Sequence, residues 1–389
     1  MKKLSQMTDR LMGQPMFHVL EKANELERQS NKKLLRFEIG DIDLPPFQHI
    51  IDDTKKALDE GHYRYVPSSG IDDFKIAVAE EMLSTHGYEP DLSNIMAIPA
   101  NAAIDHIIRC ILDAGDEVLY PSPGFSTYNS VVGYTGVVGV PYLLNADDDF
   151  GYDFDYIESL VTSKTKLMII NSPSNPLGRV MSREEVEDVC YLCRKYDLYL
   201  LSDEIYSKLI YEKEFISPYF YEDMRKRTIV QNGFSKNYSM PGWRLGYIVA
   251  PMEIIKKVSL LFQTVYSCLP SFIQHAGISA FNSNKELMDE RLRVLVNRRN
   301  ILSQGLNTIP GIQCRPADGS IFLFPDIRNT GMTSNEFVDF VMSECSVVVL
   351  PGNVFGENGE GFFRISFARS EDQITEAIKN MRLAFRGAG

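Results

Sequence analysis

Short runs of apolar residues recur through the first two thirds of the chain, and stretches with helical periodicity separate them. Such runs are typical of strands that are buried on both faces of a sheet. Seven runs are expected to be strands: NIMAI (94–98), EVLY (117–120), VVGV (137–140), KLMIIN (166–171), LYLLS (198–202), TIVQN (228–232) and LGYIVA (245–250). Their alternation with helical stretches predicts an α/β fold with a mostly parallel seven-stranded sheet and helices on both faces.

Two of the intervening stretches have a clear helical pattern, IDHIIRCILDA (104–114) and SREEVEDVCYLCRKY (182–196). Gly115 follows the first of them in DAGDEVLY, and a glycine at that place is expected to end the helix.

The pattern changes after residue 284. A long charged helix over 285–307 comes first, and three short strands and a last helix are expected at IFLFPDI (321–327), SVVVLP (346–351), FFRISFA (362–368) and EDQITEAIKNMRLAF (371–385). We therefore expect a large α/β domain over residues 41–284. A smaller α+β domain is expected to combine residues 285–389 with residues 1–40, which include a helix near 17–30.

Length, composition and net charge indicate which kinds of binding partner and location to expect. The 389 residues suit about two domains, and the formal net charge of −12 would repel a phosphate backbone, so nucleic acid is not an expected partner. The two long uncharged stretches, 118–146 and 258–284, carry Pro, Ser, Asn or Gln throughout, which a membrane span would not tolerate. Six scattered cysteines and the lack of a signal-peptide pattern in MKKLSQMTDR suggest a cytoplasmic protein.

A metal centre is not expected. Cys190 and Cys193 form a CxxC pair, but no second pair follows at zinc spacing, and the histidines show neither HxH nor HExxH. In a helix the two cysteines stand at i and i+3, which favours a structural role in the core.

Polar residues gather where three of the expected strands end. KLMII is followed by NSPSNPLG, LYLL by SDEIY, and TIVQN by GFSK, which places Asn175, Asp203, Tyr206 and Lys236 at one edge of the sheet. Ligands of open α/β sheets bind at the carboxyl ends of the strands. Arg244 follows Lys236 closely, with no acidic residue between them.

These residue types together favour pyridoxal 5'-phosphate chemistry. A free lysine with a pKa near 10.4 is protonated at neutral pH and is a poor nucleophile, whereas a lysine condensed with an aldehyde can exchange with a substrate amine. An aspartate can pair with the pyridine nitrogen of such a cofactor, and an arginine can pair with its phosphate.

At this point the chain resembles the class I and II aminotransferases of the fold type I pyridoxal-phosphate-dependent enzyme family, in order and over nearly its whole length. Seven segments carry the resemblance: IGDIDLPP, YRYVPSSG, GDEVLYPSPGFSTY, NSPSNPLG, SDEIY, GFSKNYSMPGWRLGY and FFRISFA. It implies a ping-pong aminotransferase of amino-acid metabolism or biosynthesis, in which Lys236 forms the internal aldimine and then acts as base and acid.

The resemblance also implies roles for the other site residues. Asp203 is expected to bind the pyridinium nitrogen, Asn175 and Tyr206 the ring oxygen, and Phe125 the ring face. The expected phosphate ligands are Arg244, Ser235, the amides of Ala100 and Asn101, and Tyr65 from the second subunit of a homodimer with shared active sites. Arg364, Gly40 and Asn175 are expected to bind the substrate, with Arg364 holding its α-carboxylate.

The sequence departs from the family pattern in places that concern the substrate and the phosphate. The usual Gly-x-Pro-Asp-Phe is Gly40-Asp41-Ile42-Asp43-Leu44, Gly233 stands where many members have Ser, Leu177 stands for the usual Thr, and the turn PANAAI lacks the commoner Gly. Residues 258–284 contain no Lys or Arg, and Asn101 stands where one dicarboxylate branch has a cation. A neutral or aromatic amino donor is therefore favoured over aspartate, with 2-oxoglutarate still a candidate acceptor.

Two other classes of function share the scaffold. A lyase, cyclase or oxidase that uses the same cofactor would need the same residues. A non-catalytic cofactor-binding regulator is less favoured, because no added DNA-binding segment or basic surface is seen.

Overall fold

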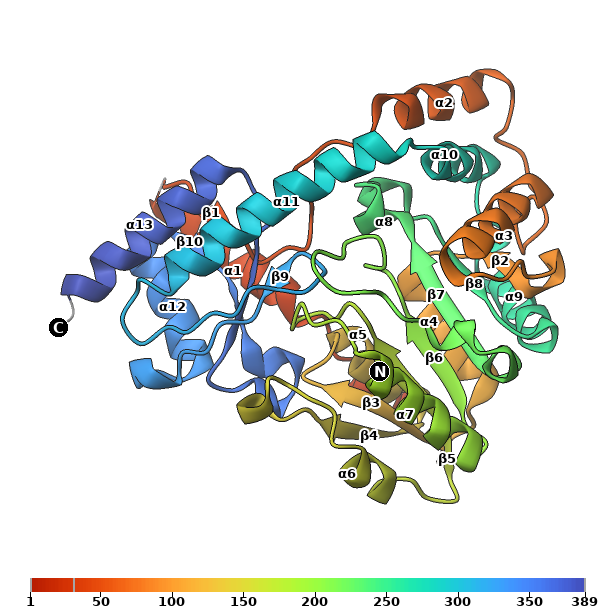
Figure 1. The fold of residues 1–389 in the computed structure, drawn as a ribbon, viewed down its shortest axis with the longest axis horizontal. Helices are drawn as coiled ribbons and strands as arrows, with labels where there is room; N and C mark the ends of the chain where they lie inside the picture. Colours follow the sequence, from red (N-terminus) through yellow and green to blue (C-terminus); the bar gives the residue numbers. More distant parts are fainter. Residues whose placement is uncertain (1, 31, 388–389) are drawn as a thin grey trace.

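The computed structural model describes residues 2–30 and 32–387, in which two sheet regions lie side by side (Figure 1). The helices are α1 (Pro15–Ser30), α2 (Gln48–Asp59), α3 (Asp72–His86), α4 (Ala100–Ile111), α5 (Ser126–Thr135), α6 (Phe154–Ser159), α7 (Arg183–Lys195), α8 (Phe234–Asn237), α9 (Met252–Tyr266), α10 (Ser271–Phe281), α11 (Lys285–Leu306), α12 (Ser334–Cys345) and α13 (Glu371–Gly387). The strands are β1 (Leu35–Arg36), β2 (Ile95–Ala97), β3 (Glu117–Ser122), β4 (Val138–Leu143), β5 (Thr165–Asn171), β6 (Tyr199–Asp203), β7 (Thr228–Gly233), β8 (Gly246–Val249), β9 (Phe322–Leu323), β10 (Val347–Val348), β11 (Leu350–Pro351) and β12 (Phe363–Ser366).

The large sheet contains the seven strands expected from the apolar runs, in the order β2-β8-β7-β6-β5-β3-β4. Strand β8 is antiparallel to both of its neighbours, and the other pairs are parallel. The prediction of a mostly parallel seven-stranded sheet is confirmed.

Helices cover both faces of this sheet. Alternate residues of β5 show the division, because Leu167 and Ile169 pack in one apolar cluster with α3, α4, α5, α9 and α10, while Met168 and Ile170 pack in another with α6 and α7. The α7 helix begins with a capping box between Ser182 and Glu185 and buries both Cys190 and Cys193, so the cysteine pair lies in the core.

One helix end differs from the prediction. The α4 helix ends at Ile111 with Leu112 as its C-cap, and Gly115 lies in the turn before β3 with a φ of +95°. The expectation that Gly115 caps the helix was wrong, because its left-handed backbone serves the turn instead.

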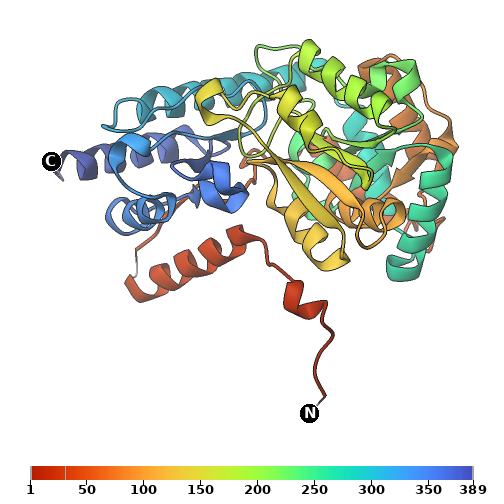
Figure 2. The same cartoon turned by 90° about the horizontal axis from the view of Figure 1, so that it is seen from below.

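The rest of the chain forms smaller sheets around a separate apolar cluster. Strands β11, β12 and β9 form an antiparallel sheet, β1 pairs with β10, and α11, α12 and α13 pack against them. Figure 2 shows α1 and the segment before it along one side of the molecule. The expected domain division, 41–284 against 1–40 with 285–389, stays a prediction.

In the part of the chain that the structure describes, none of the helices is long and apolar enough to cross a membrane.

Candidate active site

A cavity of about 410 Å³ lies at the carboxyl ends of the central strands. Its floor includes three residues in register on neighbouring parallel strands, since Asn171 on β5 pairs with Asp203 on β6, and Asp203 pairs with Gln231 on β7. Residues paired in this way point to the same face of a sheet. The topology therefore brings these three polar side chains together.

Lys236 enters the cavity from α8, the short helix that follows β7. Its ammonium donates a hydrogen bond to the carbonyl oxygen of Gly40. Burial lowers the pKa of Lys236 to about 8, and the positive charges of Arg364 and Arg244 act in the same direction, against a weaker opposing effect of Asp41. Roughly a tenth of Lys236 is then neutral at pH 7, far more than for an ordinary lysine.

Asp203 lies at the end of β6 with 3% of its surface exposed. The hydroxyl of Tyr128, on α5, donates to its Oδ2 at 2.6 Å, and the Ile205 amide donates weakly to Oδ1 at 3.4 Å. Burial raises the pKa of Asp203 to about 6 although both hydrogen bonds lower it. Burial and Asp203 raise the pKa of Tyr128, so this phenol remains a donor. Asp203 is thus mostly ionised at pH 7 although its side chain is buried.

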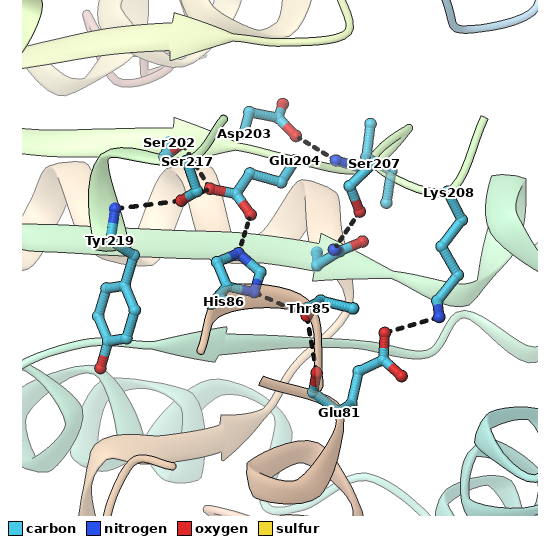
Figure 3. A network of polar contacts seen from close by, with 12 residues as sticks. Glu81, Thr85, His86, Ser202, Asp203, Glu204, Ser207, Lys208, Ser217 and Tyr219 are labelled. Atoms are coloured by element: carbon cyan, nitrogen blue, oxygen red, sulfur yellow. Dashed lines mark hydrogen bonds and ion pairs between the residues drawn. The ribbon is translucent and has the colours of Figure 1, made fainter. Parts of the chain in front are cut away.

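A second network, of hydrogen bonds, surrounds Glu204, the residue after β6 (Figure 3). The side chain of Glu204 points away from Asp203 and accepts hydrogen bonds from Ser217 at 2.6 Å and Ser202 at 2.8 Å, and its Oε2 lies 2.7 Å from Nε2 of His86. All four side chains are buried. This network ties α3 to the strand that carries Asp203.

Arg364, on β12, also lines the cavity, and 3% of its surface is exposed. Its Nη1 donates to Oδ1 of Asn175 at 2.9 Å, its Nη2 donates to the carbonyl oxygen of Glu38 at 2.5 Å, and its guanidinium lies 4.0 Å from the ring centre of Phe322. Burial lowers its pKa to about 10. Within the described residues no carboxylate pairs with it, and its buried Nε has no hydrogen-bond partner.

The N-terminus of α4 also lines the cavity. Pro99 precedes the helix and no side chain caps it, so the amides of its first turn, at Ala100 and Asn101, face the cavity without a side-chain acceptor. Ser235 and Arg244 line the same cavity. Arg244 has a left-handed backbone with φ of +53°, is exposed, and donates from Nη1 to the carbonyl oxygen of Pro241 at 3.0 Å.

The structure brings nearly all the predicted site residues together. The cavity is lined by Lys236, Asp203, Tyr206, Asn175, Arg244, Phe125, Ser235, Ala100, Asn101, Arg364 and Gly40. Tyr65 is the exception, because it lies between α2 and α3 with 88% of its surface exposed. The individual roles of these residues stay predictions.

Several lining residues were missed from the sequence. Tyr128, which does not line the cavity but donates a hydrogen bond to Asp203, was also missed, because a tyrosine in an apolar stretch is usually a core residue. Gln231 and Asn171 could have been found from the register of the strands, which the sequence alone does not give. Gln14, Met16 and Phe17 line the cavity from the N-terminal segment, and no motif marks them.

Comparisons with known proteins show the family of this chain. Residues 32–381 match the family model described as aminotransferase class I and II. The chain is 33% identical to the aspartate aminotransferase of Pyrococcus horikoshii over 374 residues, covering 94% of this chain and 95% of the relative. It is also 33% identical to aromatic-amino-acid aminotransferase 2 of Thermococcus litoralis over 359 residues, covering 91% and 92%.

A solved structure shows the same fold. The aspartate aminotransferase of Thermus thermophilus with maleate superposes with a TM-score of 0.93 at 28% identity, covering 99% of this chain and all of that one. The chain belongs to the class I and II aminotransferases, and it is an aminotransferase with the fold type I architecture.

Proposed function

We propose that this aminotransferase binds pyridoxal 5'-phosphate at Lys236 and moves an α-amino group between a neutral or aromatic amino acid and a 2-oxo acid. One observation carries the proposal. A lysine with a lowered pKa and a buried arginine, with which no carboxylate of the described residues pairs, face the same cavity as a buried aspartate. Buried charges of this kind cost free energy unless a bound ligand pairs with them.

The lining residues fit the cofactor group by group. Asp203 would accept a hydrogen bond from the ring nitrogen, Asn175 and Tyr206 would hold the ring oxygen, and Phe125 would cover the ring face. The uncapped first turn of α4, with Ser235 and Arg244, offers amides, a hydroxyl and a cation to the phosphate. When bound, the cofactor supplies an aldehyde that takes up amines and a ring that withdraws electrons from the substrate.

Lys236 would move the proton. A neutral amine is needed to accept a proton from the α-carbon of a substrate and to return it to a neighbouring atom. The lowered pKa keeps part of Lys236 neutral near pH 7, which brings its basicity close to the working pH.

Arg364 would bind the substrate α-carboxylate. Its guanidinium donates to Asn175 and Glu38, its buried Nε has no hydrogen-bond partner among the residues that the structure describes, and the planar guanidinium suits a carboxylate. A substrate carboxylate bound to Arg364 would offset the cost of burying its charge, which lowers the pKa of the guanidinium.

The side-chain end of the cavity favours an uncharged donor. Its cationic lining residues in the described chain are Lys236, Arg364 and Arg244, and the roles above use all three. Met16, Phe17, Ile39 and Phe322 supply an apolar wall. A second carboxylate would lack a partner there, which is strongly disfavoured. The relatives' names include both aspartate and aromatic amino acids, so this choice needs a test.

We also propose a homodimer with shared sites. Tyr65 and Tyr63 are 88% and 64% exposed, and Leu4 and Leu11 of the N-terminal segment are 82% and 54% exposed. A second subunit that covers such side chains could place Tyr65 at the neighbour's phosphate. A fully active monomer would contradict this. The two-domain division proposed from the sequence and a cytoplasmic location remain part of the same hypothesis.

Spectral titration of the purified enzyme with each common amino acid tests the function. Neutral or aromatic donors are expected to convert the aldehyde form of the bound cofactor to its amine form, with one 2-oxo acid released per site. Conversion by aspartate alone would contradict the proposed donor class. Release of ammonia with pyruvate would favour the lyase alternative.

A further inference from the structure

Arg291 is a buried arginine outside the cavity, and no carboxylate of the described residues pairs with it. It lies on α11 with 5% of its surface exposed, and its guanidinium lies 4.1 Å from the ring centre of Phe47. Burial lowers the pKa of this guanidinium to about 10, so it remains charged at pH 7. A buried charge without an ion-pair partner costs free energy, and the contacts that it makes therefore need an explanation.

The two hydrogen bonds of this guanidinium join two segments that are far apart in the sequence. Nη1 donates to Oγ of Ser239 at 2.8 Å, and Nη2 donates to the carbonyl oxygen of Pro45 at 2.7 Å. Ser239 lies just past the end of α8, the helix that carries Lys236. Pro45 ends the segment 40–45, which begins at Gly40 and leads toward α2. One side chain thus holds the segment of the lysine against the segment 40–45.

The same two segments also meet at the amine of Lys236. Its ammonium donates to the carbonyl oxygen of Gly40. Gly40 packs so closely that a Cβ at this position would lie 3.4 Å from Nζ of Lys236 and 2.7 Å from Cζ of Phe322. The segment 40–45 therefore forms part of the cover of the amine.

A second arginine on the same face of α11 holds the segment 40–45. Arg298 follows Arg291 by two helical turns, is 7% exposed, and donates from Nη1 to Oδ1 of Asp43 at 2.5 Å. The amide of Asp43 donates in turn to the carbonyl oxygen of Ala368 at 3.2 Å. Of the two arginines, Arg291 is the one that also binds the segment of the lysine.

The charge of Arg291 is not among the causes of the lowered pKa of Lys236. Burial is the largest cause, and the charges that also change this pKa belong to Arg364, Asp41 and Arg244. An effect of Arg291 on the amine must therefore act through the position of the two segments that it joins.

We propose that Arg291 is a positioning residue, which fixes the segment of Lys236 against the segment 40–45 and so keeps water away from the amine. The inference rests on the proposed role of Lys236 in taking up the cofactor. An amine that water cannot reach stays partly neutral near pH 7, and the neutral amine is the form that attacks an aldehyde.

Arg291→Met removes the guanidinium and both of its hydrogen bonds. The segment 40–45 should then loosen and admit water to Lys236, which should raise the apparent pKa of the amine by about one pH unit toward its ordinary value. Ser239→Ala removes one of the two hydrogen bonds and should raise this pKa by about half a pH unit. The rate at which acetic anhydride labels Lys236 in the cofactor-free full-length chain, followed against pH by peptide mass spectrometry, gives the apparent pKa.

Arg299→Met is the matched control. Arg299 also lies on α11 and is 3% exposed, but it donates to the carbonyl oxygen of Ala317 at 2.8 Å and to Glu212 at 2.6 Å, so these bonds reach neither segment. Its replacement removes a buried guanidinium from the same helix and should leave the apparent pKa of Lys236 unchanged.

A rise of about one pH unit in Arg291→Met, with a smaller rise in Ser239→Ala and none in Arg299→Met, supports the proposal. An apparent pKa within about 0.3 pH unit of wild type in Arg291→Met, or an equal rise in Arg299→Met, overturns it. If Arg291→Met does not fold, an unchanged pKa in Ser239→Ala overturns it instead. Titration of the wild-type chain with pyridoxal phosphate tests the proposed function separately, and its failure would leave the pKa comparison intact.

Discussion

Replacement of Lys236 by methionine should stabilise the cofactor-free protein at neutral pH. Burial in the cavity lowers the pKa of Lys236 from 10.5 to about 8, and Arg364 and Arg244 add to the effect. The folded chain therefore holds this proton less tightly than the unfolded chain. The resulting penalty is fully present below pH 8 and fades as the pH rises toward 10.5.

The size of the effect follows from the same values. A difference between 10.5 and about 8 corresponds to a ceiling of about 3 kcal/mol at 1.36 kcal/mol per pH unit. Loss of the hydrogen bond to the Gly40 carbonyl offsets about 1 kcal/mol, and partial access of water to the ammonium reduces the ceiling further. The net gain in the free energy of unfolding at pH 7 should be about 1–2 kcal/mol.

Urea unfolding of the cofactor-free variants at pH 7 and at pH 10.5 checks this. The gain should be present at pH 7 and largely absent at pH 10.5. Lys256→Met, on the exposed face of α9, is the control and should change little at either pH. A Lys236→Met protein that is less stable than wild type at pH 7, or equally stabilised at both pH values, would refute the reasoning.

Three further predictions concern neighbouring groups. Arg364→Lys should lower kcat/KM about 100-fold with cofactor retention unchanged, because a lysine ammonium cannot bind a carboxylate with two parallel hydrogen bonds as the buried guanidinium does. Steady-state kinetics measures this loss. Tyr128→Phe removes a hydrogen bond that lowers the pKa of Asp203, so loss of cofactor on acidification should begin about one pH unit higher, as absorbance against pH would show. His86→Leu should cost about 2–4 kcal/mol in urea unfolding, because the buried carboxylate of Glu204 loses a partner.

Each of these has an outcome that contradicts it. Unchanged kcat/KM in Arg364→Lys would show that Arg364 does not bind the substrate carboxylate. Loss of cofactor at the same pH in Tyr128→Phe as in wild type would show that Tyr128 does not lower the pKa of Asp203. Wild-type stability in His86→Leu would show that Ser202 and Ser217 suffice for Glu204.

The large sheet was predictable because its strands are buried on both faces. Each strand then appears in the sequence as a continuous apolar run. The order β2-β8-β7-β6-β5-β3-β4 is known only from the structure. Helix ends were less predictable, as Gly115 shows, since a glycine with positive φ suits a turn as well as a cap.

The site was predictable as far as it lies at strand ends. Asp203 follows an apolar run directly, and Asn175 and Lys236 each stand a few residues after one, so the topology brings all three together. Register is different, because it depends on pairing between distant segments, so the row that joins Gln231 to Asp203 could not be read from either segment alone. Arg244 has a left-handed backbone and an exposed side chain, and neither feature could be read from the sequence.

The covalent link between Lys236 and the cofactor is the central claim. Borohydride reduction of the purified enzyme, followed by digestion and peptide mass spectrometry, measures it directly. The account predicts one cofactor-derived mass increment, on the peptide that contains Lys236, and none in Lys236→Met. A colourless protein without an increment, or an increment on another lysine, would contradict the account.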